Sequence, residues 1–195
     1  MVLQFLADIL IALHMFCFAV GIGMSLVAET LIVPRFLNTI EKRDVDFLDE
    51  TIRLVGLALA GLWVTGLALM ALGYAMTDGA VIPALGVKLL IVTLLSFGTK
   101  LIVDHALPVY RHNIGHHLGV LTRYELRLLG AISGLSTTSW MLALGLGAIG
   151  MFQSLSIWQL AVIFLPLLIG APFIGAWMVP KAVDEARLGP RLALR

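Results

Sequence analysis

Five long apolar stretches are the feature that most constrains how this chain can fold. They occupy residues 8–34, 54–76, 84–108, 128–150 and 157–180. Each is longer than the roughly 20 residues that an α-helix needs to cross the hydrocarbon core of a bilayer. The sequence therefore predicts an all-α polytopic membrane protein, with five transmembrane helices packed as a bundle in a single domain over residues 1–195.

The composition agrees with this prediction and excludes other classes of protein. Hydrophobic residues make up 60% of the chain and charged residues only 13%, whereas soluble domains carry about 25% charged residues. The net charge of +1 lacks the basic excess of a nucleic-acid-binding protein. Cys17 is the single cysteine, so no intrachain disulfide can form. We expect the lipid bilayer as a partner and no nucleic acid.

The basic residues outside the apolar stretches predict the orientation in the membrane. All eleven lie in residues 35–53, 109–127 and 181–195, whereas residues 77–83 and 151–156 carry none. With five spans these three segments share one side, and an excess of Lys and Arg marks the cytoplasmic side. We therefore expect an external N-terminus, a cytoplasmic C-terminus and a place in the inner (plasma) membrane.

Ionisable residues inside the spans are costly, by about 2.5–3.5 kcal/mol each, and each needs a reason. At a rise of about 1.5 Å per residue, His14 and Lys88 lie at a similar depth in the outer third of the membrane. Glu29 lies about 22 Å further in than His14. These residues are expected to form an outer pair and an inner cluster, the latter consisting of Glu29, Lys100, Asp104 and His105.

The inner cluster has a structural and a functional interpretation. Glu29 and Lys100 would neutralise each other if the first and third helices touch, and Asp104 follows Lys100 at the i+4 spacing of a helical ion pair. The alternative is a path for protons or substrate.

The outer pair favours a cofactor or metal site more strongly. A neutral imidazole such as that of His14 is a good ligand for iron, copper or zinc, although a hydrogen-bonded structural histidine is the alternative. Lys88 can also extend its ammonium group to the membrane surface. Met15, Cys17 and Met24 add sulfur atoms near His14, and sulfur suits Cu(I). A copper site on this helix alone is weak, since adjacent residues face different sides.

Small and polar residues predict where the helices pack. Glycine and threonine allow backbones to approach, and serine and threonine bond to their own helix or to a neighbour. The relevant residues are Gly61, Thr65, Gly66, Gly130, Gly134 and the run Ser133, Ser136, Thr137, Thr138 and Ser139. Such faces are also compatible with a homodimer. The histidines at 112, 116 and 117 are expected to lie in a solvated loop.

Two short motifs resemble those of HemJ-type and CopD-like membrane proteins. The first is Leu13-His14 followed by Gly23 and closed by Pro34-Arg35, and the second is Pro83 followed by Val87-Lys88-Leu89. In that group the first helix carries a His and ends at a Pro-Arg pair, and the third opens with a motif ending in Lys-Leu. The resemblance covers the first three helices, about half of the chain.

The resemblance implies a cofactor and an activity. HemJ-type proteins bind b-type haem and oxidise protoporphyrinogen IX, with electrons passing onward to quinone, and CopD-like relatives are linked to copper uptake. His14 would be the haem or metal ligand, and Lys88 would be a cofactor-binding and catalytic residue. We expect a redox protein that binds haem b and works with a quinol or porphyrinogen. The alternatives are a copper permease and a small transporter or accessory subunit.

Overall fold

The computed structural model describes residues 2–32, 39–76, 83–149 and 155–192, and within them it is helical with no strand. Five of its helices are long and apolar enough to cross a membrane, at Val2–Thr30, Lys42–Met76, Gly86–His112, Arg123–Ala148 and Ile157–Ala186. The predicted all-α, polytopic fold is confirmed.

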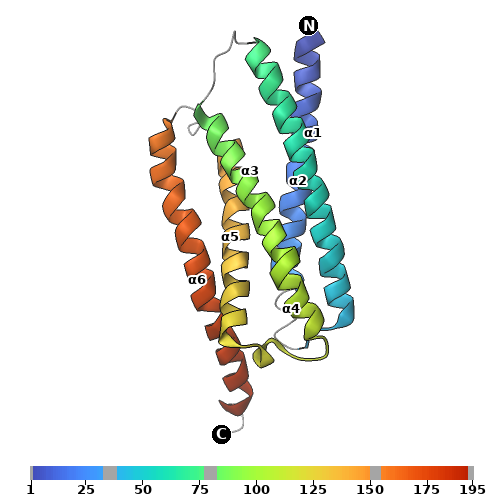
Figure 1. Ribbon diagram of the computed structural model, residues 1–195, viewed down its shortest axis with the longest axis vertical. Helices are drawn as coiled ribbons and strands as arrows, with labels where there is room; N and C mark the ends of the chain where they lie inside the picture. The colour runs from blue at the N-terminus through green and yellow to red at the C-terminus, as the bar shows by residue number, and fades with distance from the viewer. Residues whose placement is uncertain (1, 33–38, 77–82, 150–154, 193–195) are drawn as a thin grey trace.

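The helices follow one another with few intervening residues (Figure 1). α1 (Val2–Val27) continues into a π-helical turn, η1 (Ala28–Ile32), and α2 spans Lys42–Met76. α3 (Pro83–Leu101) passes through a second π-helical turn, η3 (Ile102–Ala106), into α4 (Leu107–His112). A 3₁₀ turn, η4 (Leu118–Val120), precedes α5 (Arg123–Ala148) and α6 (Ile157–Leu192).

Two antiparallel helix pairs make up the bundle, with α3 between them. α1 packs extensively against α2, and α5 against α6, while α3 contacts both α2 and α5. α1 makes little contact with α3. A ring of α1, α2, α3 and α5 therefore surrounds the interior of the protein, and α6 covers the outer side of α5.

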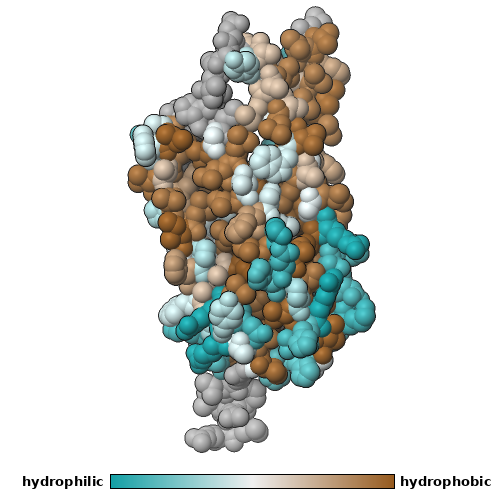
Figure 2. Space-filling model, viewed as in Figure 1, coloured by the Kyte–Doolittle hydropathy of each residue, from teal (hydrophilic) through white to brown (hydrophobic). Residues whose placement is uncertain are grey.

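Charged side chains are unevenly distributed along the length of the bundle. Charged side chains gather toward the end where the C-terminus lies, and apolar side chains cover most of the remaining surface (Figure 2). We call this the charged end, since it holds the start of α2, the end of α4 and the start of α5. Exposed apolar residues of the spans, such as Phe16, Leu57 and Phe173, would face lipid.

The helices at the charged end extend beyond the apolar stretches into the polar segments. Residues 35–53 lie outside the predicted spans, but α2 already begins at Lys42. Its first turns bury Val45, Leu48 and Ile52 and carry an ion pair of 2.5 Å between Lys42 and Asp46. Hydropathy missed this segment because an amphipathic helix with a charged outer face scores as polar.

The second polar segment, residues 109–127, is shortened from both sides. α4 runs to His112, and α5 begins at Arg123 because Thr122 and Glu125 form a reciprocal capping box. Gly115, with a φ of 87°, adopts a left-handed conformation beyond α4 that other residues rarely take. Its N–H donates to the carbonyl of Ile40 at 2.8 Å, which fastens the two connections of the charged end together.

Glycines bring α5 and α6 into direct backbone contact, as the small-residue pattern predicts. A methyl group on Gly130 would overlap the carbonyl of Gly175, and one on Gly134 would overlap the carbonyl of Ala171. On the other pair, Gly61 lies against Cys17. Both contacts depend on the absence of a side chain at the glycine.

Gly130→Ala should therefore destabilise the bundle, because the new methyl group meets backbone atoms that cannot move aside. We expect a loss of about 1–3 kcal/mol, the usual cost of overpacking. Thermal unfolding of the detergent-purified protein measures it. Gly147→Ala on the same helix meets no atom and is the matched control; equal melting temperatures for the two variants would contradict the packing argument.

The orientation predicted from Lys and Arg can be tested by labelling with a membrane-impermeant maleimide, in a background with Cys17→Ser. Gln4→Cys lies at the N-terminal end of α1, and Asp46→Cys lies at the charged end. We expect intact cells to label the former, and only permeabilised cells to label the latter. The reverse pattern would place the charged end outside.

Candidate functional site

His14 is held by a short hydrogen-bond relay between α1 and α2. Its Nδ1 lies 2.8 Å from Thr65 Oγ1, and Thr65 Oγ1 lies 2.6 Å from the carbonyl oxygen of Gly61. A hydroxyl has one hydrogen, which Thr65 donates to Gly61, so His14 Nδ1–H donates to Thr65. In the neutral ring, Nε2 then keeps its lone pair and is the atom able to bind a metal.

Glycines of α2 make this relay sterically possible. A methyl group on Gly66 would lie 3.4 Å from His14 Cε1, and one on Gly61 would lie 2.5 Å from Cys17 Sγ. The imidazole therefore lies close against the α2 backbone, one turn from Cys17. The small-residue face of Gly61, Thr65 and Gly66 was predicted from the sequence, but the bond from Thr65 to His14 was not.

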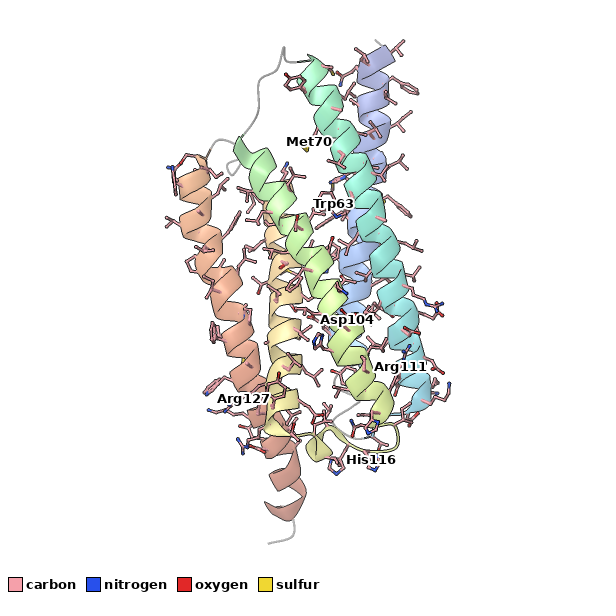
Figure 3. All side chains as sticks on the ribbon, viewed as in Figure 1. Trp63, Met70, Asp104, Arg111, His116 and Arg127 are labelled. Carbon is pink, nitrogen blue, oxygen red and sulfur yellow. The ribbon has the colours of Figure 1, made fainter. Side chains whose placement is uncertain are left out.

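Lys88 lies on α3, across the interior from α1. It is half-buried. The pairing of His14 with Lys88 stays a prediction. Trp63, labelled in Figure 3, lies on α2. Its Nε1–H donates a hydrogen bond of 3.0 Å to Ser96 Oγ, which connects α2 to α3.

The sulfur residues of α1 do not gather around His14. Cys17 shares the side that faces α2, but Met15 is 56% exposed and Met24 packs into the core cluster that contains Trp140. Within the described ranges, no group of three or more His, Cys, Asp or Glu residues is arranged to hold a metal ion. The residues proposed for copper thus face different directions.

The predicted inner cluster separates into two parts. Glu29 lies in η1 and accepts a hydrogen bond from Thr137 of α5. Lys100 instead forms an ion pair of 2.6 Å with Asp104, whose side chain is 41% exposed. The predicted neutralisation of Glu29 by Lys100 is wrong, because α1 and α3 lie across the ring from each other rather than in contact. The i+4 pair of Lys100 and Asp104 is confirmed.

Asp104 and His105 both lie on the exposed side of η3 (Figure 3). His105 is therefore not part of a site with Glu29. The histidines at 112, 116 and 117 are also exposed. His116 and His117 lie in the expected loop, whereas His112 is the last residue of α4.

A cavity of about 80 Å³ lies beside Glu29, where α1, α2, α5 and the continuation of α3 converge. Hydroxyl groups and aliphatic side chains share its wall. Its lining comprises Ser25, Ala28, Glu29, Leu48, Thr51, Ile52, Val55, Thr99, Ile102, Ala106, Tyr110, Leu129, Ile132, Ser133 and Ser136. The sequence predicted that the hydroxyls of α5 bond to their own helix or to a neighbour, but not that Ser133, Ser136, Thr51, Thr99 and Tyr110 line one cavity.

Comparison of the chain with protein-family models, curated proteins and solved structures finds no match. The resemblance of the His14 and Lys88 motifs to HemJ-type and CopD-like proteins therefore stays a prediction. Two features of the protein itself point to a function: the oriented imidazole of His14 and the cavity beside Glu29.

Thr65→Val should destabilise the protein, because it leaves the His14 N–H without an acceptor. A buried polar group that loses its partner costs about 1–3 kcal/mol. Thr65→Ser keeps the hydroxyl and should lose much less stability. Thermal unfolding of both variants in detergent tests the relay, and equal losses would show that the methyl group of Thr65 matters rather than its hydroxyl.

Proposed function

We propose that this protein is a membrane oxidoreductase that binds a b-type haem through His14. The observation that carries the proposal is the relay from His14 to Thr65. Histidines that bind metal usually donate their other ring N–H to an oxygen acceptor, which sets the tautomer and the ring orientation. The bond of His14 to Thr65 has this form and leaves Nε2 for the iron.

The side chains near His14 that could bind a metal suit haem better than a copper ion. A single imidazole is a common axial ligand of haem iron, whereas Cu(I) favours several soft ligands together. Met15 faces away from the helix pair, which leaves the copper alternative without its first sulfur neighbour. When bound, haem would supply one-electron chemistry, and the protein would supply the ligand and its surroundings.

Lys88 has a role that follows from its charge. An ammonium group at the depth of His14 would attract carboxylates, which both haem and a porphyrinogen carry. We assign it to holding such a carboxylate at the level of His14, as a cofactor-binding or catalytic residue. A quinol or a porphyrinogen is the proposed electron partner, and the inner membrane the proposed location.

An absorption spectrum of the purified protein, oxidised and then reduced with dithionite, tests this function. We expect a Soret band that shifts on reduction, with a pyridine haemochrome count near one haem per chain. His14→Ala should abolish the band. Thr65→Val should weaken haem binding by about 10–100-fold, the usual effect of losing the partner of a ligand.

The matched control is His112→Ala, which removes an exposed histidine at the end of α4. Its spectrum should equal that of the parent protein. A colourless protein purified from haem-replete cells would exclude the function. An unchanged spectrum in His14→Ala would exclude the ligand.

A further inference from the structure

The cavity beside Glu29 is a second site, and it is independent of the proposed haem function. Glu29 follows His14 by 15 residues, which is about 22 Å along a helix. We propose that this cavity binds a small primary ammonium ion, with the Glu29 carboxylate as counter-ion. The charge of the cavity, the direction of two of its hydroxyl groups and its apolar walls all favour such a guest.

Among the described residues, the carboxylate in the cavity has no basic partner. In the part of the chain that the structure describes, no Lys, Arg or His forms an ion pair with Glu29, and no basic residue lines the cavity. Besides Glu29, Tyr110 is the only titratable residue in the lining. A charge inside a membrane protein is retained for a function or neutralised by a partner. A bound cation would supply that partner.

Two hydroxyl groups of the wall, those of Thr51 and Thr99, offer acceptors rather than donors. Thr51 donates to the carbonyl of Phe47 at 2.8 Å, and Thr99 donates to that of Leu95 at 3.0 Å. Because each hydroxyl has a single hydrogen, these two oxygens keep only lone pairs for a ligand. The cavity therefore favours a guest that carries both positive charge and N–H donors.

The remaining wall excludes a bare metal ion and suits a short alkyl group. Ca²⁺ takes six to eight oxygen ligands and Mg²⁺ six, and most of this lining is aliphatic. A primary ammonium group carries three N–H donors, which matches one carboxylate and a few hydroxyl acceptors. At about 80 Å³ the cavity exceeds the 10–15 Å³ that one water occupies on the same scale. Room remains for a few carbon atoms.

The backbone around the cavity is also unusual. Both π-helical turns contribute to its wall, η1 through Ala28 and Glu29, and η3 through Ile102 and Ala106. Single π-helical turns inside α-helices occur often at functional sites. Two of them facing one cavity, from helices that make little contact elsewhere, agree with a binding site there.

Calorimetric titration of the detergent-purified full chain at pH 8 tests the proposal. The probes are ethylammonium, tetramethylammonium and sodium, all as chlorides. Ethylammonium should bind saturably at one site per chain. Tetramethylammonium has the charge without N–H donors, and sodium has the charge without an apolar body, so both should bind at least about tenfold more weakly.

Substitutions test whether ethylammonium binds in the cavity beside Glu29. Glu29→Gln should abolish it, and Thr51→Val should weaken it by about tenfold, since hydrogen bonds to charged groups are strong. Glu50→Gln removes an exposed carboxylate of α2 and should bind like the parent. Because Thr51→Val preserves shape, it tests the site even if Glu29→Gln does not fold.

Three results would overturn the proposal: no ethylammonium binding, equal binding of tetramethylammonium or sodium, or full binding by both Glu29→Gln and Thr51→Val. The same titration on His14→Ala separates this site from the haem proposal. Ethylammonium should bind that variant unchanged, whether or not the parent protein contains haem.

Discussion

Every polar group that enters the apolar part of this bundle has to find its hydrogen-bond partner inside the protein, because lipid offers none. Several hydroxyls meet this constraint within their own helices: Thr51, Thr65, Thr99 and Ser139 each donate to a carbonyl one turn back. A hydroxyl bonded in this way has used its only hydrogen and can only accept. Serine and threonine therefore become fixed acceptors, which orient the groups that face them.

Both candidate sites use hydroxyls of this kind, but the groups that these hydroxyls face differ between the two sites. Next to Thr65, the acceptor receives the N–H of His14 and directs the other ring nitrogen away from α2. Around Glu29, Thr51 and Thr99 place acceptor oxygens on a cavity that already holds a carboxylate. The first arrangement prepares a ligand for a metal, and the second prepares a place for a cation.

Close backbone contact supports both sites. Gly61 and Gly66 let α1 approach α2 so that His14 reaches Thr65, and Gly130 and Gly134 let α5 approach α6. Thr137 of α5 also donates a hydrogen bond to Glu29. The position of α5 therefore connects the α5–α6 pair to the cavity. The ring of α1, α2, α3 and α5 is thus held by small residues on its pairs and by polar bonds across its interior.

The sequence alone determined the five spans, the small-residue faces and the separation of His14 and Lys88 from the deeper ionisable residues, because hydropathy, residue size and helical rise act along one chain. It missed the first turns of α2, where an amphipathic pattern conceals a helix. It also paired Glu29 with Lys100, although each found a partner elsewhere. Those partners, and the hydroxyls that face the cavity, depend on which helices become neighbours. Spacing along a helix sets depth, but only tertiary packing sets the side of the bundle that each residue faces.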